Sequence, residues 1–218
     1  MTYVFVVLAG LGLVLAWYLS SIRRKKLRAW ASAHGLRFDP GPDASFERRH
    51  PEFGCLRRGH SRRGSNIAQG TRHGRSIEVF DYRYVTGHGK NRNVHRFSGV
   101  IVSSSIALRP LQIRAENVFD RVAEFFGAED IDFESAEFSR AFHVRASDKR
   151  WAYDVLHQRT IEFLLSMPRF SIQLGEREMI VWRGRRFAPE TFETALTVAR
   201  GILERLPRYV VRNEGGAR

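Results

Sequence analysis

The chain has 218 residues, and its 36 lysines and arginines against 23 aspartates and glutamates give a formal charge of +13. Such a charge by itself favours a nucleic acid or an anionic surface as the partner. The single cysteine, Cys55, excludes an internal disulfide and agrees with a reducing compartment.

The N-terminal segment, residues 3–22, contains no charged side chain. Twenty helical residues span about 30 Å, the thickness of the hydrocarbon core of a bilayer. We therefore expect residues 1–22 to form a transmembrane signal anchor, with a buried core helix as the alternative. Basic residues next to a span normally stay in the cytoplasm, and four of them follow here: Arg23, Arg24, Lys25 and Lys26. This predicts a single-pass protein of the cell membrane, with the N-terminus outside and residues 23–218 in the cytoplasm.

Positive charge is concentrated close to this segment. Residues 23–96 hold 18 basic and 6 acidic side chains, whereas residues 97–218 hold 18 and 17. Anionic lipid attracts each basic side chain near its surface by about 1 kcal/mol. The candidate lipid-facing residues are Arg23, Arg24, Lys25, Lys26, Arg57, Arg58, Arg62 and Arg63. The alternative is a purely compositional excess, because 32 of the 36 basic residues are arginines.

Chain breakers divide the remaining sequence. A helix that continues to Gly35 and then meets Pro40-Gly41-Pro42 indicates a basic helical stalk and linker over residues 23–42. Residues 43–210 are expected to form one soluble α+β domain with an antiparallel meander and alternating helices and strands; two subdomains that meet at 107–136 are the alternative. Residues 211–218 are expected to be a disordered tail.

The meander is predicted between Asn66 and Ile106, where β-branched and aromatic residues run between turns at His73-Gly74 and Gly87–Asn93. Alternation along the middle strand indicates that both faces of the sheet are partly covered. It places Phe80, Tyr82 and Tyr84 on one face and Ile77, Val79 and Val85 on the other.

Helices and strands are then expected to alternate. The apolar spacing predicts a short helix over 119–127, a strand over 138–144 and a helix over 148–167. The runs "FSIQL" and "MIVW" predict a hairpin, and residues 189–206 are predicted to form an amphipathic helix.

Several stretches make the chain resemble a family of uncharacterised bacterial membrane-anchored proteins whose soluble region is a domain of unknown function. These are "LRAWASAHGLRF", "RRGHSRRGSNIAQGTRHGRSIEVFDYRY", "HRFSGVIV", "EFSRAFHVRASDKRWAYDVLHQRTIEFLL" and "LERLP". The resemblance covers nearly the whole chain and implies the same architecture. It supplies no activity and no catalytic residues.

Several polar groups are candidates for chemistry, but none has the spacing of an established motif. Cys55 and His60 lack the context of an activated thiol. Asp154 and His157 stand three residues apart on one helix, where a local ion pair is far more common than an acid–base dyad. The potential metal ligands are His60, His73, His88 and His95 with Cys55 or Asp81. Their spacings match no compact zinc pattern.

The remaining candidates also have plainer explanations. The stretch 87–93 contains glycines and a lysine but lacks the spacing of a phosphate-binding loop, and it is expected to be a solvated hairpin tip. Trp151, Tyr153 and Trp182 are expected in the core or at an interface rather than on a base-stacking platform.

The sequence therefore predicts no catalytic residue, cofactor or metal site. It favours a membrane-tethered interaction or scaffold domain that contacts anionic lipid and is not an enzyme; no protein partner is identified. One alternative is a membrane-anchored enzyme whose site is assembled from distant residues. The other alternative is nucleic-acid binding at the membrane. It is disfavoured because neither a helix that could read base edges nor aromatic residues that could stack on bases accompany the basic residues.

Overall fold

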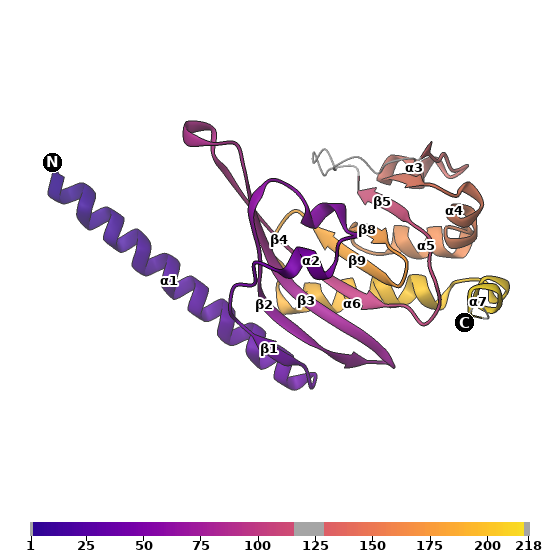
Figure 1. Cartoon of the computed structure of the whole chain (residues 1–218), viewed down its shortest axis with the longest axis horizontal. Coiled ribbons are helices and arrows are strands. Elements are labelled where there is room, and N and C mark those ends of the chain that lie inside the picture. The colour runs from indigo at the N-terminus through magenta and orange to yellow at the C-terminus, as the bar shows by residue number, and fades with distance from the viewer. Residues whose placement is uncertain (1, 116–128, 216–218) are drawn as a thin grey trace.

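The computed structural model describes residues 2–115 and 129–215, and its centre is a nine-stranded antiparallel sheet (Figure 1). The strand order is β1-β2-β3-β4-β9-β8-β5-β7-β6. The strands are β1 (Arg37–Asp39), β2 (His60–Arg72), β3 (Arg75–Thr86), β4 (Asn93–Ser103), β5 (Leu111–Ala115), β6 (Glu129–Asp130), β7 (Phe142–Ala146), β8 (Ser171–Leu174) and β9 (Glu178–Arg183).

Seven α-helices and two short 3-10 helices are described around this sheet. The α-helices are α1 (Thr2–Ala33), α2 (Phe46–Arg49), α3 (Ala136–Ala141), α4 (Lys149–Val155), α5 (Gln158–Ser166), α6 (Pro189–Glu204) and α7 (Arg208–Gly215). The 3-10 helices are η1 (Gly54–Leu56) and η2 (Gly89–Asn91). The α+β class expected from the sequence is therefore confirmed.

The predicted meander is present as β2, β3 and β4. The turn between β2 and β3 is His73-Gly74, and both residues have positive φ, 51° and 73°. Two successive positive φ values are typical of the type I′ turn, whose twist matches that of the strands it joins. The β3–β4 hairpin is longer, carries η2 at its tip and projects from the body of the molecule (Figure 1).

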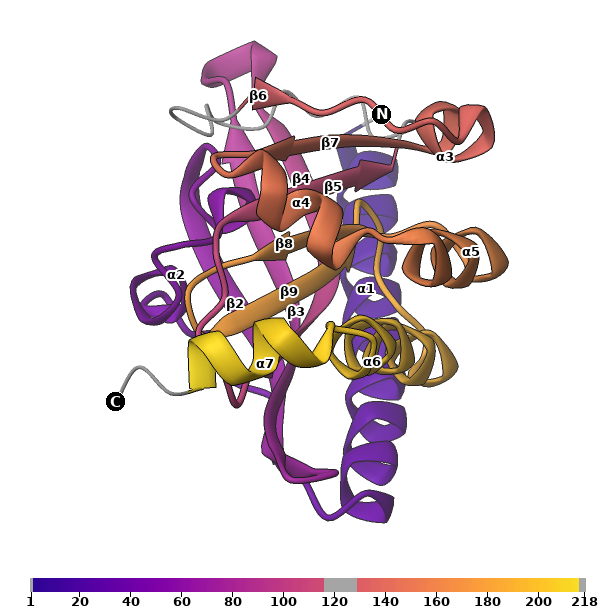
Figure 2. The same ribbon diagram turned by 90° about the vertical axis from the view of Figure 1, so that its right-hand side faces the viewer.

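Both faces of the sheet are covered, as the alternation along β3 predicts. Ile77 and Val79 belong to the larger hydrophobic cluster, together with α6 and the end of α1. Phe80, Tyr82 and Tyr84 belong to a second cluster on the opposite face, beneath α2 and η1. In Figure 2, α1, α5 and α6 lie to one side of the strands and α2 to the other.

Helix α1 corrects the prediction of a membrane anchor. Among the described residues, none of the helices combines the length and the apolar character that crossing a membrane requires. This finding overturns the transmembrane signal anchor at residues 1–22 and the single-pass location in the cell membrane. The physical reason is that α1 becomes basic at Arg23, and that Leu27, Trp30 and Ala31 are then buried in the larger cluster. The second half of α1 is thus a helix of the domain.

The later elements differ from prediction at three points. One is the C-terminus, where residues 211–215, expected to belong to a disordered tail, continue helix α7. The expected strand over 138–144 begins only at Phe142, because Ser135 caps α3 by accepting a hydrogen bond of 3.3 Å from the backbone nitrogen of Phe138. The expected helix over 148–167 is broken into α4 and α5 at Leu156 and His157, whose backbones are not helical. The β8–β9 hairpin and α6 are confirmed. The helix predicted over 119–127 lies outside the described residues.

Candidate anion-binding surface

Three arginines lie side by side across the meander. Arg63 on β2 is the register partner of Arg83 on β3, and Arg83 is in turn the partner of Arg96 on β4. Directly opposed side chains on antiparallel strands lie about 5 Å apart at their Cβ atoms, and like charges in such positions are destabilising. We call these three residues, together with Arg92 near the hairpin tip, the arginine cluster.

The electrostatics of the arginine cluster show its excess of positive charge. Burial lowers the pKa of Arg83, and repulsion from Arg63, Arg92 and Arg96 lowers it further. Within residues 2–115 and 129–215, no carboxylate forms an ion pair with any of these four guanidinium groups. Arg63, Arg92 and Arg96 are exposed and Arg83 is half-buried, so the cluster is open to an anion from outside.

A bulge in β2 brings Arg63 to this position. Counted from the His73-Gly74 turn, the register would place Arg63 opposite Tyr84, but it shifts by one residue between Ser65 and Ala68. Asn66 lies in this irregularity with a φ of 50°, a conformation that asparagine tolerates better than most residues. A shift of one residue moves a side chain to the other face of the sheet. The bulge therefore places Arg63 on the face that carries Arg83.

On the same face of the sheet, the next residue along β3 is a carboxylate, and an arginine of α1 neutralises its charge. Asp81, two residues before Arg83, is only 2% exposed and accepts hydrogen bonds from Arg23 at 2.7 and 2.5 Å. It also accepts one from Ser98 at 2.5 Å and one from Asn66 at 2.9 Å. Arg23 further donates to the carbonyl of Phe187 at 2.8 Å. The carboxylate of Asp81 is thus committed to holding α1 on the sheet and is not free to neutralise the arginine cluster.

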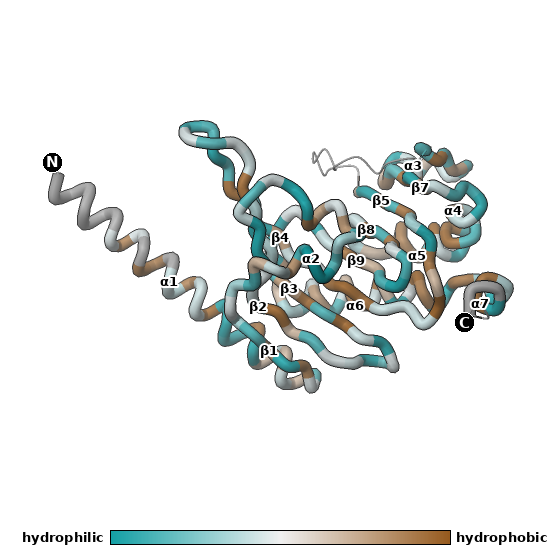
Figure 3. The backbone as a smooth tube through the Cα atoms, viewed as in Figure 1, coloured by the Kyte–Doolittle hydropathy of each residue, from teal (hydrophilic) through white to brown (hydrophobic). Residues whose placement is uncertain are grey.

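The N-terminal half of α1 extends beyond the domain, to the same side as the β3–β4 hairpin (Figure 1). Large apolar side chains are exposed along it, with Trp17 reaching 70% exposure. The others are Leu11, Val14, Leu15, Tyr18 and Leu19. The hairpin tip, by contrast, is hydrophilic (Figure 3). An apolar helix and a basic hairpin therefore project together from one end of the molecule.

The residues predicted to face lipid have different environments. Arg24, Lys25, Lys26, Arg57 and Arg63 are exposed. The other three are at least partly buried: Arg23 binds Asp81, Arg58 lies beside the cavity lined by Cys55 and Tyr84, and Arg62 pairs with Glu47 and donates to the carbonyl of Arg57.

Three members of the arginine cluster, Arg83, Arg92 and Arg96, were missed by sequence reasoning. The signal that could have found Arg83 and Arg96 is the spacing of the β3–β4 hairpin, which pairs these two residues. Pairing with Arg63 depends on the bulge and has no comparable signal in the sequence. The arginine cluster as a whole becomes visible only once three strands are aligned.

The sequence candidates for catalysis and metal binding do not converge. Among the described residues, no group of three or more histidine, cysteine, aspartate or glutamate side chains is placed to hold a metal ion. Asp154 accepts a hydrogen bond from Tyr209 at 2.5 Å, whereas His157 bonds to the carbonyl of Arg205 at 2.8 Å. The two members of the suspected dyad thus have separate partners. Trp151 and Trp182 are buried, as expected, whereas Tyr153 is 42% exposed and does not lie in the core.

A second group of charged side chains lies on the face of the sheet opposite to the arginine cluster. There, the imidazole ring of His50 lies between two carboxylates. Its Nδ1 is 2.8 Å from Glu178 and its Nε2 is 2.9 Å from Glu78. Burial lowers the pKa of His50, but hydrogen bonds and attraction from these carboxylates outweigh it and raise the pKa to about 9. At neutral pH His50 is therefore an imidazolium that donates from both ring nitrogens and fastens the α2 segment to β3 and β9.

These features define an α+β protein with one nine-stranded antiparallel sheet and a basic face beside its first helix. No family model matches the sequence, and no curated protein does. Among solved structures, the fold is similar to the crystal structure of the mycobacterial trehalose monomycolate transport factor A, TtfA, with a TM-score of 0.64. The two chains are 12% identical, and the match covers 84% of this chain and 96% of that chain. At this identity the likeness shows the fold alone.

Proposed function

We propose that the protein is a non-enzymatic interaction domain that binds the surface of anionic lipid through the arginine cluster. The observation that carries the proposal is the row Arg63–Arg83–Arg96, which crosses three strands without a paired carboxylate among the described residues. Such a row costs folding free energy, so an anionic partner that neutralises it supplies a reason for its presence.

Two observations favour a lipid surface over nucleic acid. The first is the exposed apolar side chains of α1, which project to the same side as the β3–β4 hairpin (Figure 1). Apolar and aromatic side chains beside basic ones suit the boundary between headgroups and acyl chains. The second is that the exposed Arg24, Lys25 and Lys26 follow these apolar side chains on the same helix, an order of apolar and basic residues that suits a lipid interface and not a nucleic-acid backbone. The structural neighbour is named as a transport factor, a description that fits a non-catalytic role.

The proposal is tested with vesicles and the full-length chain. Phosphatidylcholine vesicles that contain increasing shares of phosphatidylglycerol are sedimented with the protein at low and high salt. The double variant Arg83→Gln/Arg96→Gln should bind about 10- to 30-fold more weakly, because each basic residue near the surface contributes about 1 kcal/mol. Binding by the unchanged protein should fall as salt rises.

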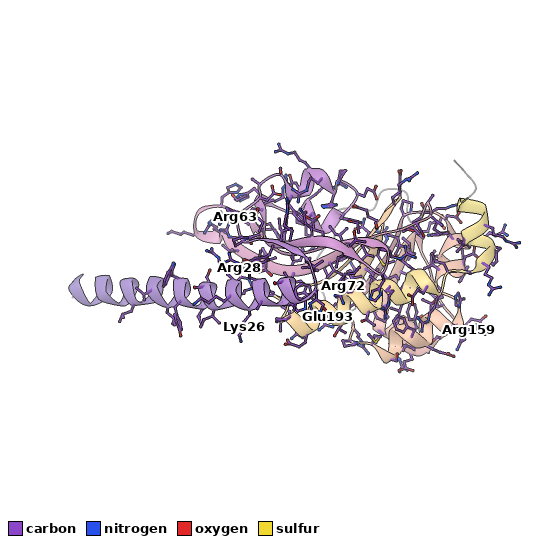
Figure 4. The ribbon with its side chains drawn as sticks, turned by 90° about the horizontal axis from the view of Figure 1, so that it is seen from below. Lys26, Arg28, Arg63, Arg72, Arg159 and Glu193 are labelled. Carbon is purple, nitrogen blue, oxygen red and sulfur yellow. The ribbon has the colours of Figure 1, made fainter. Side chains whose placement is uncertain are left out.

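A matched control removes the same charge elsewhere. Arg159 and Arg169 are exposed and lie outside the arginine cluster, and Figure 4 shows Arg159 at the opposite end of the molecule from Arg63. The variant Arg159→Gln/Arg169→Gln should bind vesicles like the unchanged protein. Equal loss in both double variants would indicate a general charge effect and would contradict the proposal. Binding of a short DNA duplex with no binding of vesicles would replace it with the nucleic-acid function.

A further inference from the structure

A separate hollow lies between the β2–β3 turn and α6, on the α6 side of the sheet. Its volume is about 210 Å³. The floor is apolar, since it consists of the register partners Ile77 on β3 and Val102 on β4, and Leu196 of α6 forms part of the wall. Ile77 lies six residues from Arg83 along β3, about 20 Å in an extended strand, so the hollow is distinct from the arginine cluster.

The rim of the hollow is basic. Arg72, His73 and Arg75 come from the β2–β3 turn and its flanks, and Arg200 comes from α6. The single carboxylate among the lining residues, Glu193, accepts hydrogen bonds from Arg72 at 2.9 and 3.1 Å (Figure 4).

Glu193 is further engaged by α1. It accepts a bond of 3.0 Å from Trp30 Nε1 and lies 3.2 Å from His34 Nε2. Its capacity is therefore used by Arg72 and by α1, so this carboxylate does not neutralise the other two arginines of the rim, Arg75 and Arg200.

Arg75 and Arg200 retain donors for a ligand. Arg75 donates to the carbonyl of Ser103 at 3.3 Å and, in the part of the chain that the structure describes, forms no ion pair. Arg200 donates to His73 Nε2 at 3.2 Å and forms an exposed ion pair with Glu204, whose Nε–Oε1 distance of 3.7 Å is too long for a hydrogen bond and leaves its N–H donors available. Two guanidinium groups with spare N–H donors thus stand above an apolar floor.

We propose that this hollow binds a small amphiphilic anion, a carboxylate or a phosphate monoester carried on a short apolar chain. Guanidinium groups match the geometry of both anions and bind them through paired hydrogen bonds. The apolar chain would cover Ile77, Val102 and Leu196 and remove their surface from water. The hollow is smaller than the roughly 300–1,000 Å³ of sites for drug-sized ligands, so the chain must be short.

Isothermal titration calorimetry with hexyl phosphate, hexanoate, hexanol and inorganic phosphate tests this proposal on the full-length protein. Hexyl phosphate and hexanoate should bind more tightly than hexanol, which lacks the charge, and than inorganic phosphate, which lacks the chain. The variant Arg75→Gln/Arg200→Gln should weaken hexyl phosphate binding at least about tenfold, since charge-assisted hydrogen bonds are lost. Arg159→Gln/Arg169→Gln should not change it.

A second variant separates the apolar part of the site from its charge. Leu196→Asn should weaken binding of hexyl phosphate and leave that of inorganic phosphate unchanged, and a thermal melt shows whether each variant remains folded. Arg83→Gln/Arg96→Gln should bind hexyl phosphate normally, so this site and the proposed lipid surface can fail independently. Binding to anionic vesicles that is lost in Arg75→Gln/Arg200→Gln would identify a lipid headgroup as the source of the anion. Equal affinity for hexyl phosphate and inorganic phosphate, or unchanged affinity in the rim variant, would overturn the proposal.

Discussion

Arg83 is flanked on both sides by another arginine at the same level of the sheet, and it is the half-buried member of the arginine cluster. Because like charges in opposed positions repel, we predict that Arg83→Gln stabilises the fold by about 0.5–1 kcal/mol. Urea unfolding at low ionic strength measures this change. The same substitution should weaken vesicle binding, so stability and function should move in opposite directions.

Salt provides the control for the Arg83 prediction. The repulsion within the arginine cluster acts between groups at or near the surface, and salt screens such interactions. The stabilisation by Arg83→Gln should therefore shrink in about 0.5 M sodium chloride, where the Debye length is only a few ångströms. A variant that is less stable than the unchanged protein at both salt concentrations would show that packing of the Arg83 stem outweighs the repulsion.

His50 makes stability depend on pH. Its folded-state pKa of about 9 lies above the ordinary histidine value of 6.5, so its contribution is complete below about pH 6.5 and is lost as pH rises through about 9. Burial raises the pKa of Glu78, but His50 and Arg49 outweigh it and hold this pKa below the ordinary glutamate value of 4.5. The contribution of Glu78 is therefore lost as pH falls below that value.

Comparison with a His50→Gln variant isolates the histidine. The unchanged protein should exceed this variant in unfolding free energy by about 1–3 kcal/mol near pH 6, and the difference should vanish above about pH 9. Urea unfolding followed by tryptophan fluorescence between pH 5.5 and 9.5 measures it. A difference that stays constant across this range would mean that His50 acts by packing, through its ring contacts with Phe46 and Phe53, rather than by charge.

At the scale of elements, one of the contacts that attach α1 to the sheet is an ion pair between Arg23 and Asp81, which lie 58 residues apart in the sequence. Arg23 is 19% exposed and Asp81 2%, so removal of the arginine leaves a buried carboxylate without its charge partner. We predict that Arg23→Gln costs about 3–5 kcal/mol of unfolding free energy, as expected when one member of a buried pair is removed. It should also raise hydrogen exchange in the second half of α1.

The next residue on the helix supplies the control for this prediction. Arg24 is exposed, so Arg24→Gln removes the same charge without touching Asp81 and should change stability by less than about 0.5 kcal/mol. Equal losses in the two variants would show that the charge of α1, and not the Arg23–Asp81 bond, holds the helix. Unchanged exchange in Arg23→Gln would show that Leu27, Trp30 and Ala31 suffice to attach it.

At the scale of the whole molecule, regular patterns in the sequence gave correct predictions where local geometry decides the outcome. The His73-Gly74 turn, the alternation along β3 and the apolar spacing of α6 all correspond to observed elements. Each depends on residues close together in the chain, so its signal is contained in a short window. The α+β class follows from the sum of such windows.

What could not be predicted depends on contacts between distant residues. The sequence pattern "RRKK" was interpreted through its neighbours alone, whereas Arg23 in fact bonds to Asp81 on β3. The arginine cluster requires a bulge in β2 as well as the alignment of three strands. The hollow combines a hairpin turn with α6, more than a hundred residues later. A pattern within one segment contains no information about which distant segment will lie against it.

The two ends of the strand order have a consequence for how partners can bind. The outermost strands, β1 and β6, contain three and two residues, and charged side chains occupy most of their positions: Arg37, Asp39, Glu129 and Asp130. Short charged edges discourage another chain from extending a sheet by backbone pairing. The sheet is thus poorly suited to grow sideways into an assembly or an aggregate. The faces of the sheet and their side chains are then better suited to recognition than its edges, so single substitutions should be able to separate one binding activity from another.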